Sequence, residues 1–111
     1  METRSKELRR CDVLTVIGRI DADTAPAFGR ALAEITGAGR YKIVVNLKDV
    51  TYISSAGLSE LIDAQKTCTH LRRGQLVLLH ISPRIKEVLE LAGLTPLFKV
   101  FDDESEAVGS F

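Results

Sequence analysis

Short apolar runs of strand length alternate along the chain with segments in which apolar residues recur at helical spacing. The first run, DVLTVIGRI, is rich in β-branched residues and ends at an Asp-rich turn, as strands commonly do. The strand-like runs are 12–20, 41–47 continued by 50–53 after a break at Lys48 and Asp49, 75–81 and 97–101; the helical segments are 25–35, 56–71, 83–92 and 102–108. Strands that alternate with helices are joined by right-handed crossovers. The sequence therefore predicts an α/β domain with a mostly parallel central sheet of about four to five strands and helices packed around it.

Capping residues and apolar spacing indicate where each helix begins and which side it buries. Asp23 or Thr24 is expected to cap the first helix, and Ser82 with Pro83 is expected to open the third. Gly74 and Gly93 are expected to end the second and third helices. The polar segment before residue 12 is expected to pair as an edge strand. The residues expected to face the core are Ala25, Phe28, Leu32 and Ile35, then Leu58, Leu61, Ile62, Cys68 and Leu71, then Ile85, Val88, Leu89, Leu91 and Ala92.

Length and composition limit the classes of protein to which this chain can belong. The 111 residues are most simply one domain, 1–111, and 45% of them are apolar, enough to bury a core without disulfides or metals. Lysine plus arginine equals aspartate plus glutamate at 15 each, so no basic excess favours direct binding to nucleic acid or to an anionic membrane. This balance points to protein or small-molecule partners.

The cysteines and the N-terminal segment predict the cellular compartment of the protein. Cys11 and Cys68 form no CxxC pair, and Cys68 lies on the apolar face of the second helix, which is typical of a small core residue. Disulfide-dense secreted scaffolds look different. The N-terminal METRSKELRR has charges with no apolar stretch behind it, unlike a signal peptide. We expect a soluble cytoplasmic domain with no membrane segment.

The octapeptide TYISSAGL, residues 51–58, lies where the second predicted strand gives way to a helix, the position at which α/β folds gather functional groups. It lacks the G-x-S-x-G pattern of a nucleophile turn and the lysine of a P-loop. His70 lies too far along the helix to reach back to it, and His80 has no evident acidic partner. No group of clustered ligands suggests a metal. We therefore expect no catalytic residue, no metal and no cofactor.

The two serines of this stretch have two interpretations. Serine is a favoured helix cap, yet one cap requires only one of Ser54 and Ser55. The second serine, followed by Ala56 and Gly57, leaves free N–H groups with little side-chain cover, which suits a close partner or a phosphate on the serine itself. From the residues alone, the two interpretations have equal weight.

Three passages in order resemble those of a known family. They are GRID followed by TAP at 18–26, VNL…V…ISSAGL at 45–58, and GxL followed by V…L…GL at 74–94. Over nearly its whole length the chain is similar to a stand-alone STAS domain, the anti-sigma-factor-antagonist family. The strand–loop–helix passage around Ser54 and Ser55 is the most specific of the three.

The resemblance implies a partner switch. Such a domain binds, when unphosphorylated, an anti-sigma factor that is also a serine kinase of the GHKL type, and a sigma factor is released. Phosphorylation of a loop residue breaks the complex, and a metal-dependent serine phosphatase restores it. Carried over by position, the phosphoacceptor is Ser55, with Ser54 as second choice because many members have Asp at that position. The implied partner-binding residues are Asp21, Thr24, Ser54, Ser55, Ala56, Gly57 and Leu58.

Other roles remain open for the same fold. STAS domains also serve as subunits of stress-signalling complexes and of lipid-transport machinery. A different class would be a module that senses a small ligand. A partner-switching protein should bind its kinase in a nucleotide-dependent manner, whereas a sensor should gain thermal stability from a small molecule. For either role we expect a monomer or a weak dimer.

Overall fold

The structure, a computed structural model, describes residues 1–111 and contains one five-stranded sheet with the strand order β1-β2-β3-β4-β5. The elements are β1 (Glu2–Glu7), β2 (Asp12–Ile20), α1 (Ala25–Gly37), β3 (Lys42–Ile53), α2 (Ser55–Thr69), β4 (Gln75–Leu79), α3 (Pro83–Leu91), β5 (Val100–Phe101) and α4 (Glu104–Gly109), with short 3-10 turns at His70–Arg72 and Thr95–Leu97. The predicted α/β fold is confirmed. None of the helices is long and apolar enough to cross a membrane.

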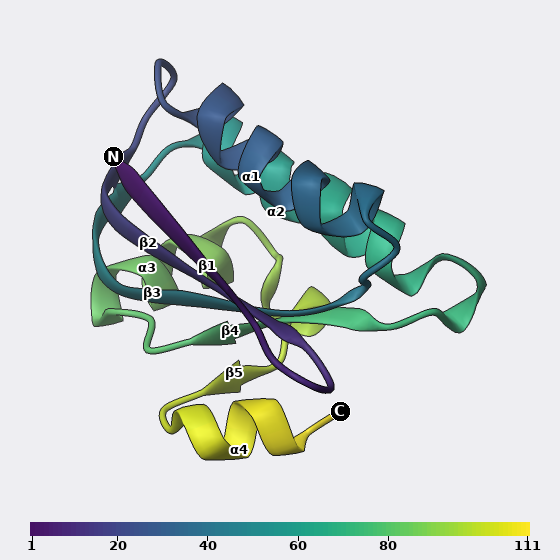
Figure 1. The fold of residues 1–111 in the computed structure, drawn as a ribbon. Helices are drawn as coiled ribbons and strands as arrows, with labels where there is room; N and C mark the ends of the chain where they lie inside the picture. The colour runs from purple at the N-terminus through teal and green to yellow at the C-terminus, as the bar shows by residue number, and fades with distance from the viewer.

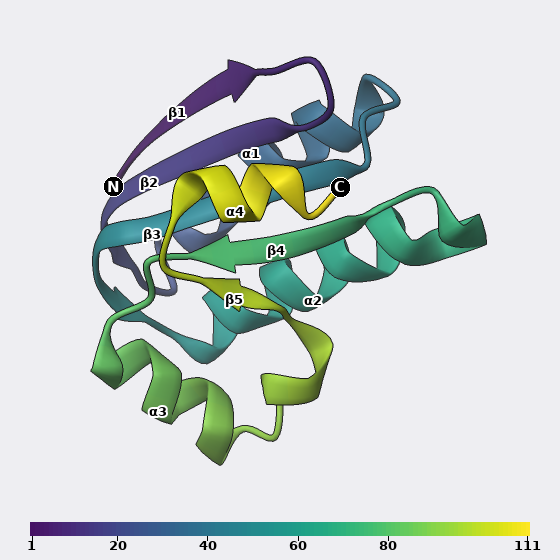
Figure 2. The same ribbon diagram turned by 90° about the horizontal axis from the view of Figure 1, so that it is seen from below.

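The order of the strands explains the layering of the molecule. β2, β3, β4 and β5 are parallel neighbours, and β1 pairs antiparallel with β2 as the expected edge strand. Right-handed crossovers that always step to the next strand in the same direction place every connecting helix on the same face of the sheet. Figures 1 and 2 show this arrangement: α1 and α2 cover one face, α3 lies at the β5 edge of the sheet, and α4 alone crosses the other face.

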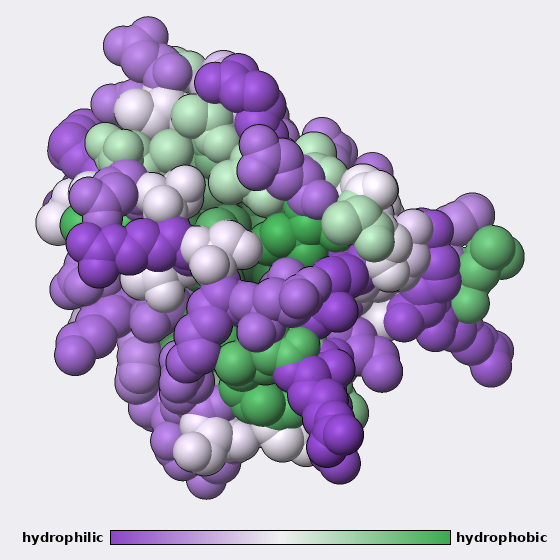
Figure 3. Space-filling model, viewed as in Figure 1, coloured by the Kyte–Doolittle hydropathy of each residue, from purple (hydrophilic) through white to green (hydrophobic).

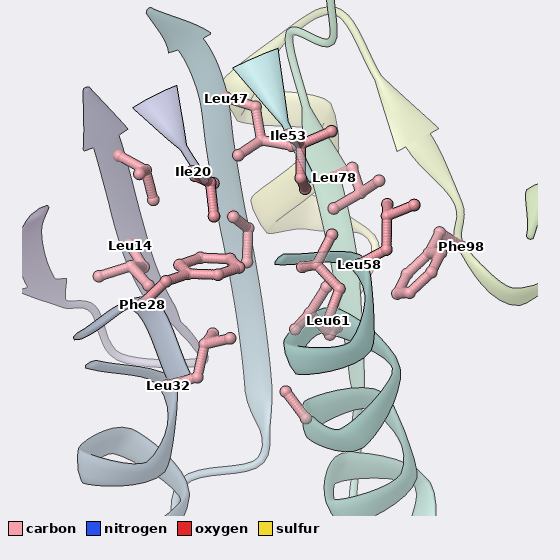
Figure 4. Close-up of a cluster of buried hydrophobic side chains, with 14 of the residues drawn as sticks. Leu14, Ile20, Phe28, Leu32, Leu47, Ile53, Leu58, Leu61, Leu78 and Phe98 are labelled. Atoms are coloured by element: carbon pink, nitrogen blue, oxygen red, sulfur yellow. The ribbon is translucent and has the colours of Figure 1, made fainter. Parts of the chain in front are cut away.

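The larger core lies between the sheet and the connecting helices. Phe28 and Leu32 of α1 and Leu58 and Leu61 of α2 are buried there against side chains of β2, β3 and β4. Figure 4 shows Leu58 directed toward Leu78 and Phe98 and Phe28 lying beside Leu14. Because α1 and α2 cover adjacent strands, they also pack against each other, and the loops that precede them lie at the same edge of the sheet.

A smaller core fills the opposite face beneath α4. It consists of Cys11, Val13, Val44, Val77, Leu79 and Ala107. Since successive strand residues point to opposite faces, Val44 belongs to this core while its neighbours Ile43 and Val45 belong to the larger one. The sheet is therefore buried on both faces at its centre.

β3 is longer than the sequence indicated. The expected break at Lys48 and Asp49 is wrong, because the strand runs without interruption from Lys42 to Ile53. Its register against β2 shifts between the pairs Thr15–Asn46 and Ile17–Asp49, so a β-bulge absorbs an extra residue while the pairing continues. The Lys48 N–H donates to Asn46 Oδ1 at 3.1 Å.

Four residues that were expected to face the core do not belong to it. Leu71 is 80% exposed, because α2 ends at Thr69 and the following turn gives Leu71 a φ of +55°. Leu91 is 81% exposed and Ala92 is also exposed, since the buried stripe of α3 ends with Leu89. Ile62 is only half-buried.

Two of the predicted strands are shorter than expected. β4 ends at Leu79, and His80 after it has a φ of +57°, an uncommon conformation for a residue other than glycine. Only Val100 and Phe101 of the expected last strand pair with β4, because Thr95–Leu97 forms a 3-10 turn.

Gln65 is a buried polar residue that the sequence did not single out. Its amide oxygen accepts from Leu76 N–H at 2.7 Å, and its amide nitrogen donates to the carbonyls of Leu76 and Leu97 at 2.9 and 2.7 Å. These bonds fix α2 to β4 and to the turn before β5. Since its amide has partners on both atoms, burying this polar group carries little desolvation penalty.

Candidate functional site

The carboxyl ends of β2 and β3 bring two sequence-predicted loops together. The Ser54 N–H donates to the Ile20 carbonyl at 2.8 Å, which extends the pairing of the two strands by one step. Asp21 follows Ile20 directly, and Ser55 follows Ser54. The structure therefore places Asp21 and Thr24 on one loop and Ser54 and Ser55 on the adjacent one, at a single edge of the sheet (left side of Figure 1).

Ser54 is the residue that caps α2. Its backbone is extended (φ −86°, ψ 170°), and its Oγ accepts the Gly57 N–H at 3.2 Å. Its carbonyl accepts the Leu58 N–H at 2.9 Å, the first bond of the helix. Both side-chain and backbone acceptors of Ser54 are thus used in starting the helix.

Ser55 occupies the first helical position and is free of such ties. It is exposed, and its hydroxyl makes no hydrogen bond within the chain, unlike that of Ser54. The backbone N–H groups of Ser55 and Ala56 also donate to no group of the protein. The site therefore presents a free hydroxyl beside two free N–H donors at the positive end of the helix dipole.

Gly57 and Leu58 lie beneath this surface. Both residues are buried, and a Cβ on Gly57 would come within 2.7 Å of Ile20 Cγ2 and 2.9 Å of Ile53 Cγ1. Only glycine allows the helix to begin so close to the two strand ends. Gly57 and Leu58 shape the loop from below, while Ser55 is exposed and Ala56 is half-buried.

Asp21 organises the neighbouring loop. Its Oδ1 accepts the N–H groups of Asp23 and Thr24, both at 3.0 Å, and lies 3.1 Å from the Thr24 hydroxyl. The hydrogen bond from the Thr24 N–H, joined by those from the Thr24 hydroxyl and the Asp23 N–H and by the charge of Arg19, lowers the pKa of Asp21 below its ordinary value. The loop is held by an ionised aspartate.

The side-chain cap expected from Asp23 or Thr24 is wrong. Thr24 occupies the capping position of α1, yet no side chain caps that helix. The Thr24 hydroxyl instead lies 2.8 Å from the Arg19 carbonyl and accepts the Asp21 N–H at 2.9 Å. Thr24 therefore ties its loop to the end of β2, which holds Asp21 in place.

An aromatic–cation pair beside the site was missed. Arg19 and Tyr52 are partners across β2 and β3, and the Arg19 guanidinium lies 4.5 Å from the centre of the Tyr52 ring. Both residues directly precede the strand ends that carry the two loops. Cross-strand pairing was the one signal that could have indicated this contact from the sequence. Using it requires the register of β3 against β2, which the β-bulge shifts. The structure holds no cluster of three or more His, Cys, Asp or Glu residues suited to a metal ion.

Comparison with known proteins gives a consistent picture. The family described as STAS domain matches residues 3–107. An anti-sigma-B factor antagonist of Listeria monocytogenes is 29% identical over 110 residues, which cover 99% of this chain and 95% of that protein. A Thermotoga maritima structure, described as a candidate anti-sigma factor antagonist, superposes with a TM-score of 0.90 at 23% identity, covering 97% of this chain and 92% of that one.

A second structural relative is known in two chemical forms. The anti-sigma factor antagonist SpoIIAA, a Bacillus cell fate determinant, superposes with a TM-score of 0.76 in both its unphosphorylated and its phosphorylated form. The identities are 15% and 19%, and each alignment covers 98% of this chain and at least 96% of the other. At these identities the likeness shows the fold.

Proposed function

The chain belongs to the STAS domain family, and from this premise we propose that it is an anti-sigma factor antagonist controlled by phosphorylation of Ser55. In this proposal the unphosphorylated form binds an anti-sigma factor that is also a serine kinase of the GHKL type. A metal-dependent phosphatase reverses the modification. The protein itself performs no catalysis and works in the cytoplasm. The names of the relatives, including the Listeria antagonist, support this assignment.

One observation carries the choice of serine. Ser54 Oγ is occupied by the Gly57 N–H, whereas the exposed Ser55 hydroxyl has no partner. A kinase must bring the acceptor hydroxyl into its own active site, and Ser54 could enter one only by giving up the cap of α2. Losing such a cap typically costs about 0.5–2 kcal/mol. Ser55 can be modified with the helix intact.

A phosphate on Ser55 should leave the domain folded. It adds about −1.5 to −2 charges beside the free N–H groups of Ser55 and Ala56. An anion at a helix N-terminus is stabilised by about 0.3–1 kcal/mol. The equal TM-scores of the two SpoIIAA forms against this chain support the view that this fold accommodates a phosphate.

The same charge should break a protein–protein interface. A partner docked on the Asp21 and Ser55 loops would bury the phosphate without a matching cation. Uncompensated charges of this kind cost on the order of 2–5 kcal/mol. Because each 1.4 kcal/mol is a factor of ten, affinity should fall by roughly 30-fold to several thousandfold. The switch would act through surface charge, with the backbone unchanged.

The test is phosphopeptide mapping together with partner binding. After incubation with the cognate kinase and ATP, we expect phosphate on Ser55 and none after Ser55→Ala. Ser54→Asn supplies a matched control, since asparagine removes the hydroxyl but remains a good cap; this variant should still be modified. Phosphate found only on Ser54 would overturn the assignment.

Binding of variants tests the interface separately from the chemistry. Ser55→Asp should fold normally and lose the kinase. Ser105→Asp places the same charge in the first turn of α4, on the opposite face of the sheet, and should bind the kinase like the unmodified protein. If both variants bind as tightly as wild type, the Ser55 loop does not form the interface.

A further inference from the structure

The end of the molecule opposite Ser55 carries a concentration of positive charge. Three loops meet there because they precede the amino ends of the parallel strands β2, β3 and β4. The basic residues of these loops are Arg9, Arg10, Arg40, Arg72 and Arg73, and Lys42 follows as the first residue of β3. The loops lie at the right of Figure 1, and in the same view Figure 3 shows hydrophilic side chains at this end, as over most of the visible face, with one hydrophobic group protruding at the far right.

A cavity of about 210 Å³ opens between these loops. Its lining consists of Arg10, Cys11, Asp12, Gly39, Arg40, Tyr41, Lys42 and Arg73. Four of these eight residues are cationic and only Asp12 is acidic. Asp12 is buried and is paired with Arg40, so its charge is compensated within the protein.

Two guanidinium groups of the cavity are held in fixed positions. Arg40 is paired with Asp12 and with Glu7 at 3.2 Å, and its Nη2 donates to the carbonyl of Leu8 at 2.7 Å. Arg73 lies 3.7 Å from the centre of the Tyr41 ring. Arginines that are already ordered lose less conformational entropy when they bind a ligand.

The walls of the cavity are fixed by close backbone packing. A Cβ on Gly74 would approach the Tyr41 carbonyl oxygen within 2.2 Å, so only glycine allows the loop before β4 to lie against the loop before β3. Arg73 also donates to the carbonyls of Thr67 and His70 at 2.7 and 3.0 Å. These contacts hold Arg73 in place in the cavity lining that it shares with Lys42.

The two remaining cations are free to bind. The side chains of Arg10 and Lys42 make no hydrogen bond or ion pair within the chain, whereas those of Arg40 and Arg73 are anchored. The cavity is smaller than the roughly 300–1,000 Å³ of sites for drug-sized ligands. Its size and its planar guanidinium donors suit a compact anion, for which arginine is the favoured binding residue.

We propose that this cavity binds a phosphate group that carries two or more negative charges. Arg10 and Lys42 contact the group directly, while Arg73 supplies positive charge from a fixed position; the charge of Arg40 is balanced by Asp12 and Glu7. The phosphate can belong to a small soluble molecule or to a lipid headgroup. If the phosphate belongs to a lipid headgroup, Leu71 can contact the hydrocarbon of the bilayer, because it is 80% exposed beside Arg72 and Arg73.

Titration with pyrophosphate tests the cavity directly. In backbone NMR spectra of the intact protein, we expect saturable shifts at Gly39, Lys42 and Arg73, with a dissociation constant below about 1 mM. The double substitution Arg10→Gln with Lys42→Gln should weaken binding by at least about tenfold. Lys86→Gln with Lys99→Gln removes the same charge from exposed positions outside the cavity and should leave the affinity unchanged.

The outcomes separate this proposal from the one for Ser55. Ser55→Asp should bind pyrophosphate like the wild type, because it lies at the other end of β3. If the two double variants weaken binding equally, the protein attracts anions by net charge alone and the cavity is not a site. Absence of saturable shifts in the wild type, combined with no binding to vesicles, would also overturn the proposal.

Vesicle sedimentation distinguishes the two sources of phosphate. Binding to phosphatidylcholine vesicles that contain phosphatidic acid, but not to pure phosphatidylcholine, would support a headgroup ligand. Such binding should weaken in Leu71→Ser and in the Arg10 and Lys42 double variant. Saturable pyrophosphate binding without vesicle binding would support a soluble ligand instead.

Discussion

Ser54 Oγ accepts the Gly57 N–H, while the neighbouring Ser55 hydroxyl faces solvent with no partner in the chain. The sequence could predict that one of two adjacent serines caps a helix, because capping is a local property. It could not decide which serine is the cap, because that depends on the residue at which β3 ends. Ser54 is held at this end by a hydrogen bond to Ile20 of the neighbouring strand.

The unequal roles of the two serines should be measurable as stability. Ser54→Ala removes a cap and should lower the free energy of unfolding by about 0.5–2 kcal/mol. Ser55→Ala touches an exposed side chain and should change it by no more than about 0.5 kcal/mol. Urea titrations of both variants provide the comparison. Equal losses would mean that both hydroxyls are structural.

Asp21 should make the free energy of unfolding depend on pH in a direction that follows from its lowered pKa. The hydrogen bond from the Thr24 N–H, the largest cause, lowers the pKa of Asp21 from 3.8. When the pKa of a carboxyl group is lower in the folded chain than in the unfolded chain, its carboxylate stabilises the fold fully at any pH above the unfolded-state pKa. This stabilisation is lost as the pH falls through the folded-state pKa. We expect the NMR titration midpoint of Asp21 to lie below 3.8, and Asp21→Asn to weaken the dependence of stability on pH in this acidic range. A midpoint above 3.8 would contradict the loop geometry.

For whole elements, the apolar spacing predicted most of the buried face of α2, with Ile62 as the exception inside the helix. Leu58, Leu61 and Cys68 are buried as expected, because they lie within the regular helix. Leu71 fails because the chain leaves the helix after Thr69 and turns outward with positive φ. No cap or proline marks this change in the sequence. The bulges in β3 were equally hidden, since they arise from pairing with β2.

Two leucines test this boundary of α2. Leu61 is 1% exposed and Leu71 is 80% exposed. Leu61→Ala should cost about 2–5 kcal/mol of stability through lost burial and a residual cavity. Leu71→Ala should change stability by less than about 0.5 kcal/mol. Denaturant titration measures both, and a small loss for Leu61→Ala would show that the core beneath the Ser55 loop is not packed as described.

Two helical glycines test the start of α2. Replacing a helical glycine by alanine normally stabilises a protein by about 0.4–1 kcal/mol, and Gly37→Ala should follow this rule because nothing lies within 4 Å of its added Cβ. Gly57→Ala should instead destabilise by about 1–3 kcal/mol, since its Cβ would overlap Ile20 and Ile53. Thermal melts of the two variants should shift in opposite directions. A stabilised Gly57→Ala would mean that the helix start can move away from the strands.

At the scale of the whole molecule, composition concealed the main electrostatic feature. Lysine plus arginine and aspartate plus glutamate are equal at 15, which argued against an anionic partner. The parallel sheet nevertheless brings six basic residues from three separate segments of the chain to one end. Net charge is a sum over residues, whereas a binding site depends on their placement, and only the strand order supplies that placement.

The two cysteines report on the integrity of both cores. Cys68 lies in the larger core and Cys11 in the smaller one, and burial raises the pKa of both thiols, that of Cys68 to about 11. Thiols that are buried and protonated near neutral pH react only when the structure opens. We expect iodoacetamide to label both at one slow rate that rises with urea. Faster labelling of Cys11 would show that the smaller core opens locally without global unfolding.

The strand order also bears on how the chain acquires its structure during synthesis. Every strand of the sheet pairs with the next one in the sequence, so each newly emerged strand finds its neighbour already available on the nascent chain. No segment must wait for a distant partner, which limits the time that unpaired edges are exposed to other chains. Only α4 breaks this order. It follows all five strands in the sequence and covers Val44 and Val77 at the middle of the sheet, so the second face stays open to water until residues 104–109 have been synthesised.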